Sequence, residues 1–175
     1  MNTYIKTLYS PERASISFSF FKTNLALSFS PWIGPAKKKL VEYNGAKSLS
    51  TTISDDSAAT MHHLAKNIVE GVIQDPIRYE IPCNRDAMIV FEYDPGQAYL
   101  SIEKNGSRIR FEFTIQRYLQ KINGDVDVRV VQSGLIVFMK VLEAYLIAVS
   151  ADRQHEGSID ESYTKSQQQA FTSGW

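Results

Sequence analysis

Apolar and hydroxyl-bearing residues alternate near the start of the chain in a pattern that predicts a β-hairpin. Every second residue is apolar over 15–21, and the same alternation returns over 25–30. Side chains two residues apart point to the same face of a strand, so each segment would have one apolar face and one serine-rich face. The polar residues 22–24 separate the two segments and predict a tight turn.

The period-two pattern predicts that most of the chain is β-structure. Asn-Gly pairs at 44–45, 105–106 and 123–124 favour hairpin turns, because both residue types tolerate a positive φ angle. Residues 1–12 show no clear alternation and are predicted to form an irregular lead-in. The further predicted strands cover residues 40–43, 47–53, 77–83, 88–93, 98–104, 108–115 and 126–130.

Two segments carry apolar residues at helical spacing. The first helix, over 57–73, is predicted to follow the polar cluster at 54–57, whose carboxylates suit the positive end of a helix dipole. The second, over roughly 134–150, carries few charges, so most of its sides should be buried in the core or at a subunit contact. Its candidate subunit-contact residues are Phe138, Met139, Leu142, Tyr145 and Leu146.

The elements follow the order strands, helix, strands, helix. This order predicts an α+β protein with antiparallel sheets and two main helices, in one domain over 1–151. The domain would have two pseudo-halves, 14–75 and 76–151, which share the order of elements but no repeated sequence. Residues 152–175 show little periodicity and are predicted to be a flexible tail. Its aromatic tip, at 171–175, would either pack on its own domain or dock a partner.

Composition and spacing argue against several classes of site. The single Cys83 excludes an intramolecular disulfide and a cysteine-rich zinc site, and its position on the apolar side of a strand predicts a buried, inert thiol. His62 and His63 point about 100° apart on a helix and cannot both face one metal ion. No nucleotide-binding or hydrolase motif occurs. We therefore expect no enzymatic activity, no metal and no cofactor.

The location of the protein is predicted from the same features. The N-terminus has no apolar signal segment, and no uninterrupted run of about 18 apolar residues occurs. We therefore expect a cytoplasmic protein that has no membrane contact.

Positive and aromatic side chains favour a nucleic-acid ligand. The formal net charge is zero, but the tail from residue 152 carries four acids against two bases, which leaves the remaining chain mildly positive. Lysine and arginine neutralise phosphates, and aromatic faces stack unpaired bases; ordinary solvated sheet faces and loops have the same composition. The candidate binding residues are Arg13, Lys22, Trp32, Lys37, Lys38, Lys39, Tyr43, Lys104, Arg108, Arg110, Arg117, Tyr118 and Lys121.

The order of elements, with amphipathic strands and an apolar second helix, resembles the Whirly class of single-stranded-DNA-binding proteins. It is also similar to a doubled positive-cofactor-type coactivator core and to kinetoplastid guide-RNA-binding proteins. The resemblance covers 14–150 and implies two splayed sheets, an oligomer contact through the helices, and nucleic acid running over the sheet edges. The lysine-glycine-lysine-alanine motif of plant Whirly proteins is absent, so no site residue is carried over. In size, β-rich body and polar tail, the chain is also similar to phage-encoded single-stranded-DNA-binding cofactors of a viral RNA polymerase.

Two hypotheses about function follow. The favoured one is a non-catalytic, largely sequence-independent single-stranded-DNA-binding protein acting in transcription, replication or recombination. It would be a homo-oligomer, with RNA as an alternative ligand and an RNA polymerase as a candidate partner. The alternative is a structural or protein-interaction module that oligomerises through its second helix and docks a partner with its C-terminal tail.

Overall fold

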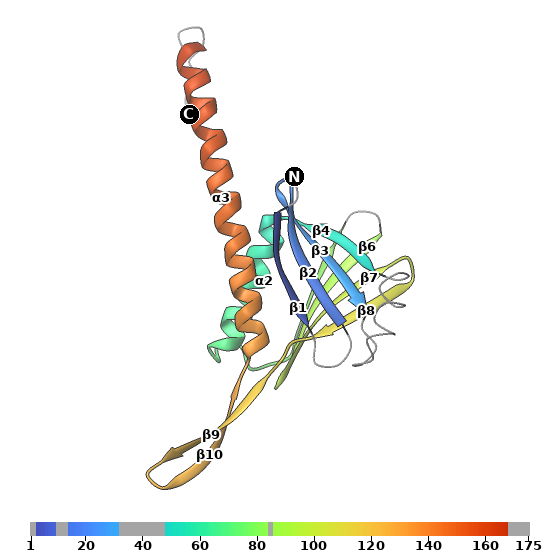
Figure 1. Cartoon of the computed structure of the whole chain (residues 1–175), viewed down its shortest axis with the longest axis vertical. Coiled ribbons are helices and arrows are strands. Elements are labelled where there is room, and N and C mark those ends of the chain that lie inside the picture. Colours follow the sequence, from blue (N-terminus) through green and yellow to red (C-terminus); the bar gives the residue numbers. More distant parts are fainter. Residues whose placement is uncertain (1–2, 10–13, 32–47, 84–85, 168–175) are drawn as a thin grey trace.

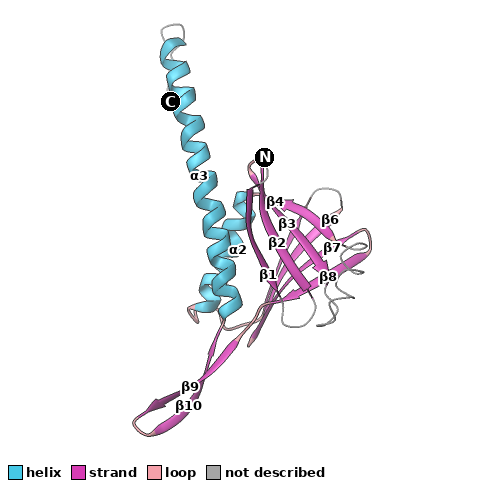
Figure 2. Cartoon of the chain, in the orientation of Figure 1, coloured by secondary structure: helices cyan, strands magenta, loops and turns pink. Residues whose placement is uncertain are grey.

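The chain forms two four-stranded antiparallel sheets, a two-stranded ribbon and two helices (Figure 1). The computed structural model describes residues 3–9, 14–31, 48–83 and 86–167. Both helices lie on one side of the sheets (Figure 2). The α+β class, the antiparallel sheets and the order strands, helix, strands, helix are confirmed.

The first sheet has its strands in chain order. They are β1 (Thr3–Tyr9), β2 (Ala14–Phe21), β3 (Asn24–Pro31) and β4 (Leu49–Ile53). The predicted hairpin corresponds to β2 and β3, joined by a two-residue turn in which Lys22 has a φ angle of 56°. The prediction of an irregular lead-in over 1–12 was wrong, because β1 pairs with β2. A register shift between Tyr4 and Lys6 interrupts the alternation of this strand, which hid it in the sequence. The strand predicted over 40–43 lies outside the described residues.

The second sheet is also a meander, followed by the ribbon. Its strands are β5 (Ile77–Pro82), β6 (Ala87–Asp94), β7 (Gln97–Lys104) and β8 (Ser107–Glu112). The predicted turn at Asn105-Gly106 is confirmed, with φ angles of 51° and 77°. The strand predicted to reach residue 115 ends at Glu112 instead. The chain then leaves the sheet to form the ribbon strands β9 (Gln116–Ile122) and β10 (Asp125–Val131).

The two helices differ from their predicted ends. Helix α2 (Asp55–Val69) starts directly after Ser54, whose side chain accepts a hydrogen bond from the backbone N–H of Ser57 at 3.3 Å. It ends earlier than predicted, because Gly71 adopts a φ angle of 76° that no helix can continue. Helix α3 (Ser133–Gln167) is far longer than predicted, so the expected tail from residue 152 begins inside a helix.

The inner faces of the two sheets and the buried sides of both helices enclose one core. Phe138 of α3 lies between the sheets, with ring centroids 5.9 Å from Phe18 and 5.0 Å from Phe113. Tyr145 donates a hydrogen bond to the Thr23 carbonyl oxygen at 2.6 Å. The candidate subunit-contact residues Phe138, Leu142 and Tyr145 are therefore core residues of their own chain, and Met139 and Leu146 are partly buried against the same core.

Helix α3 contains a stretch whose length and composition would suffice to cross a membrane. Over Ser133–Ala151 the mean hydropathy is 1.8, although Lys140 and Glu143 interrupt the apolar run. Leu135, Phe138 and Leu142 of this stretch pack in the core, and 33% of the stretch is buried.

Candidate nucleic-acid interface

A cleft lies on the outer face of the first sheet beside its edge strand β4. Its volume is about 490 Å³. The walls come from the β2–β3 turn, from β4 and from the end of β7 in the second sheet. The described lining residues are Phe21, Asn24, Ala26, Ser50, Thr51, Thr52 and Lys104. The cleft therefore joins both sheets at an edge where the ladder of hydrogen bonds ends.

An aromatic ring and one ammonium group line this cleft, and a second ammonium group lies beside the ring. Phe21 is 44% exposed, and Lys22 Nζ lies 5.7 Å from the centroid of its ring. Across the cleft, Lys104 Nζ donates a hydrogen bond to the Ser50 carbonyl oxygen at 2.9 Å, which holds its positive charge over β4. The described lining contains no carboxylate. This site can therefore offer positive charge and an aromatic face to one ligand.

The hydroxyl groups beside the cleft form a polar, uncharged surface. Ser50 donates a hydrogen bond to the Ser28 hydroxyl at 3.1 Å, and the hydroxyls of Ser30 and Ser48 are 2.9 Å apart. These side chains are the serine-rich face that the alternation predicted. Hydroxyls of this kind can bind phosphate and sugar oxygens without adding charge.

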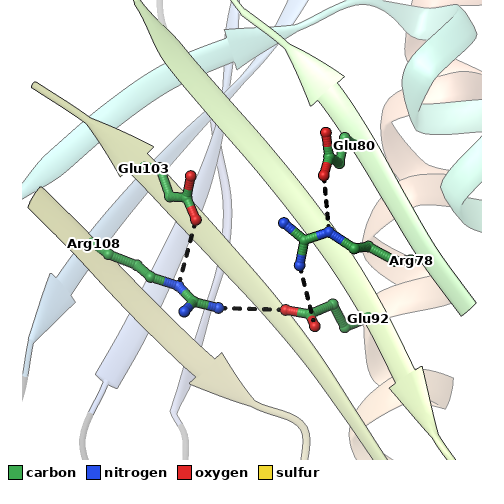
Figure 3. Close-up of polar contacts among 5 residues, drawn as sticks. All are labelled: Arg78, Glu80, Glu92, Glu103 and Arg108. Atoms are coloured by element: carbon green, nitrogen blue, oxygen red, sulfur yellow. Dashed lines mark hydrogen bonds and ion pairs between the residues drawn. The ribbon is translucent and has the colours of Figure 1, made fainter. Parts of the chain in front are cut away.

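The outer face of the second sheet is a network of ion pairs (Figure 3). Arg78 contacts Glu80 at 2.8 Å and Glu92 at 3.3 Å. Arg108 contacts Glu92 at 3.4 Å and Glu103 at 3.7 Å. Glu92 therefore contacts two arginines, Arg78 of β5 and Arg108 of β8. The hydrogen bond to Glu80 is the main cause that raises the pKa of the Arg78 guanidinium.

The remaining arginine on this face is also engaged. The Arg110 guanidinium stacks 3.5 Å from the centroid of the Tyr99 ring, and Glu112 accepts a hydrogen bond from Gln97 at 2.7 Å. Three arginines therefore share the face with four glutamates, according to the strand register. A phosphate could bind Arg108 only in competition with carboxylates that already hold it. The predicted platform of Arg108 and Arg110 is thus a neutralised surface.

The other predicted residues are dispersed. Lys104 lines the cleft and Lys22 lies beside the Phe21 ring, whereas Arg117, Tyr118 and Lys121 lie on the ribbon β9–β10, which extends away from both sheets (Figure 1). Arg13, Trp32, Lys37, Lys38, Lys39 and Tyr43 lie outside the described residues. The basic-aromatic group of Trp32 and its three lysines therefore stays a prediction.

Phe21 is the cleft residue that the sequence analysis missed. It follows the core residue Phe20 directly, so it has the parity of the serines on the outer face. A large apolar residue at a polar position, one residue before a turn, is a signal that could have identified it.

Titratable groups elsewhere offer little chemistry. Burial is the main cause that raises the pKa of the Cys83 thiol, and a raised pKa makes the thiol a weaker nucleophile at neutral pH. The thiol also donates a hydrogen bond to the Ile81 carbonyl oxygen at 3.3 Å. In the part of the chain that the structure describes, no group of three His, Cys, Asp or Glu side chains could hold a metal ion.

A contact between a histidine ring and a carboxylate joins the two helices. Glu143 Oε1 of α3 lies 3.0 Å from His62 Nε2 of α2, and Glu143 Oε2 accepts a hydrogen bond from Lys140 at 3.1 Å. These two contacts, that of His62 first, lower the pKa of the Glu143 carboxyl. His62 is therefore used in helix packing.

The Glu143 contact should make stability depend on acid pH. Because the folded-state pKa lies below the ordinary value of 4.5, the contact stabilises the fold above pH 4.5 and is lost as the pH falls further. We expect the difference in unfolding free energy between wild type and Glu143→Gln to shrink below pH 4.5. Urea unfolding at a series of pH values measures it, with His62→Gln expected to reduce the same pH dependence. A difference that stays constant from neutral to acid pH would contradict this assignment.

At the cleft beside β4, Lys104 belongs to a described lining without carboxylates, and Lys22 lies beside the exposed ring of Phe21. The charged and aromatic side chains at this cleft therefore form the candidate binding site. No known protein family, curated protein or solved structure matches the chain.

Proposed function

We propose that the protein is a non-catalytic single-stranded-DNA-binding protein that binds largely without sequence preference through the cleft beside β4. The observation that carries the proposal is a cleft lined by Phe21 and Lys104 and by no described carboxylate, with Lys22 beside the Phe21 ring. The two groups that a single strand needs, positive charge for phosphates and an aromatic face for a base, are thereby within reach of one ligand.

The architecture supports the same function. Two antiparallel meanders precede α2 and α3 in the chain, and the resemblance to Whirly proteins rests on this order of elements. In that class single-stranded nucleic acid runs over sheet edges, and the cleft lies at the edge strand β4. Helix α2 and the part of α3 up to Val149 pack against the core, so their buried sides cannot read the major groove of a duplex.

The cleft suggests a division of roles. Lys22 and Lys104 would contact phosphates on the two sides of the cleft, and a base would stack on Phe21. Stacking on an aromatic side chain contributes ~1–3 kcal/mol per base and tolerates every base. The adjacent serine hydroxyls would bind backbone oxygens. An unpaired strand can present its bases in this way, whereas a duplex keeps them stacked inside.

Fluorescence anisotropy with a labelled single strand tests the proposal, with the matching duplex as competitor. We expect tight single-strand binding at low salt that weakens as salt rises. Each lysine that contacts a phosphate should contribute about −0.7 to the slope of log K against log salt, so Lys22→Gln with Lys104→Gln should flatten that slope. Phe21→Ala should weaken binding by ~1–3 kcal/mol and leave the salt slope unchanged.

A matched control removes the same number of charges elsewhere. Lys66→Gln with Lys140→Gln changes two exposed lysines of α2 and α3, away from the cleft lining. This pair should bind nearly as well as wild type. The lack of single-strand binding at low salt would overturn the proposed function. Equal losses in the cleft pair and the control pair would overturn the role of the cleft.

A further inference from the structure

The ribbon β9–β10 has two faces of different character. The register pairs Leu119 with Val128, Lys121 with Val126, and Arg117 with Val130, which places these six residues on one face, here called the apolar ribbon face. Leu119 is 71% exposed, and the three valines are at least half exposed. The apolar ribbon face therefore combines four exposed aliphatic side chains with two positive charges.

On the opposite ribbon face, polar side chains contact one another. Arg129 lies 3.4 Å from Asp127 and donates a hydrogen bond to Gln120 at 3.0 Å. Asp125 and Tyr118 share this face by the register. Both acids of the ribbon are thus on the face away from Arg117 and Lys121, which leaves the apolar ribbon face with positive charge alone.

Two hydrogen bonds hold the ribbon at its base, and the aliphatic side chains of the apolar ribbon face are exposed along its length. Gly134 N donates a hydrogen bond to the Thr114 carbonyl oxygen at 2.7 Å, and Ser133 Oγ donates to the same oxygen at 3.1 Å. An isolated two-stranded hairpin is marginally stable in water, and a helix or further strands normally cover its apolar side. A contiguous exposed apolar face with a polar rim marks an interaction surface.

The charges indicate what could cover it. Two apolar ribbon faces packed on each other would bring Arg117 and Lys121 together with their own copies, and like charges at such a contact are unfavourable. A covering element should instead be acidic. Helix α3 offers one, because beyond Ala151 it carries Asp152, Glu156, Asp160 and Glu161 against Arg153 and Lys165.

The positions of the two elements prevent them from meeting within one chain. Helix α3 has 35 residues, a length of about 50 Å, and its C-terminal part extends away from the sheets (Figure 1). The ribbon extends from the opposite end of the molecule. The sequence of the acidic part of α3 also includes the apolar residues Ile159 and Tyr163.

We propose that the apolar ribbon face of one molecule binds the acidic C-terminal part of α3 of a second copy of this chain. Arg117 and Lys121 would pair with its carboxylates, and the aliphatic side chains of the ribbon would be covered by the helix. Each copy carries one ribbon and one acidic helix end at opposite ends of the molecule, so the contact is head-to-tail and propagates into a ring or a filament. The proposal is independent of nucleic-acid binding at the cleft.

Sedimentation of the full chain with exchanged charges tests the contact. The wild type is expected to associate into multiples of its 19.8 kDa mass, and salt should weaken the association. Arg117→Glu with Lys121→Glu should sediment as a monomer, as should Glu156→Lys with Asp160→Lys. An equimolar mixture of the two variants should associate, because the intact ribbon of one can bind the intact helix of the other.

Controls separate this contact from misfolding and from other interfaces. Gln116→Glu with Gln120→Glu adds negative charge to the opposite ribbon face and should leave association unchanged. Circular dichroism should show the same unfolding transition for all monomeric variants. The proposal is overturned by a wild type that stays monomeric at its highest soluble concentration. It is equally overturned by charge-reversed variants that associate as wild type does, or by a folded mixture that stays monomeric.

Discussion

Replacing Phe138 by alanine is expected to lower the free energy of unfolding by about 3–5 kcal/mol. The Phe138 ring is fully buried and packs against Phe18 of the first sheet and against Phe113, which follows the second. Its removal would leave a cavity where α3 and both sheets meet, and would also remove two aromatic contacts worth ~0.5–1.5 kcal/mol each beyond their area. Urea unfolding followed by circular dichroism measures the loss as a shift in midpoint at constant slope.

Ile147→Ala is the matched control for this prediction. Ile147 lies on the same helix but is 70% exposed, so its truncation should change stability by no more than about 0.5 kcal/mol. If Phe138 served as a subunit contact, as the sequence first suggested, the loss would vary with protein concentration. A loss that is independent of concentration supports its place in the core of its own chain. Equal effects of the two substitutions would contradict the described packing of α3.

The sheets could be predicted from the sequence because their signals are local. Alternation placed Ile16 and Phe18 on the core side, and the residue pair Asn105-Gly106 specified a two-residue turn. That turn also sets the register of β7 and β8, so the pairing of Glu103 with Arg108 could have been foreseen. The strand β1 was missed because its register shift breaks the alternation on which the prediction depends.

The features that depend on tertiary packing could not be predicted. Periodicity places Phe113 correctly on the core side, but it does not show that the strand has ended at Glu112 and that the chain is leaving the sheet. An apolar stripe on a helix has the same spacing whether it faces its own core or another subunit, which is why α3 was ambiguous.

In the candidate site, too, the features with local signals could be predicted and those that depend on tertiary packing could not. Alternation placed Arg108 and Arg110 on an outer face, as found, but the shared contact of Glu92 with two arginines depends on the register of four neighbouring strands. Lys22 and Lys104 were both named from the sequence. The placement of Lys104 at the same cleft as Phe21, the neighbour of Lys22, follows from the packing of the two sheets, which no local pattern encodes.

Gly134→Ala is expected to destabilise the protein, although alanine is the better helix former. At an ordinary helical position the exchange would stabilise by about 0.5–1 kcal/mol. Here a Cβ atom at Gly134 would lie 2.5 Å from the Thr114 backbone nitrogen and 3.0 Å from the Phe113 Cβ atom. The nearest atom belongs to the backbone at the base of the ribbon, so it cannot move aside as a flexible side chain would. We expect a loss of about 1–3 kcal/mol in the free energy of unfolding, as for other overpacked sites.

Ser133→Ala separates the steric effect from the loss of a hydrogen bond at the same place. It removes the contact of Ser133 Oγ with the Thr114 carbonyl oxygen and should cost only about 0.5–1.5 kcal/mol. Because Gly134 fixes the chain where it leaves the ribbon for α3, Gly134→Ala should also change the direction of the ribbon and so weaken self-association. Urea unfolding gives the first effect and sedimentation the second. A Gly134→Ala protein as stable as wild type would show that α3 starts farther from Thr114 than described.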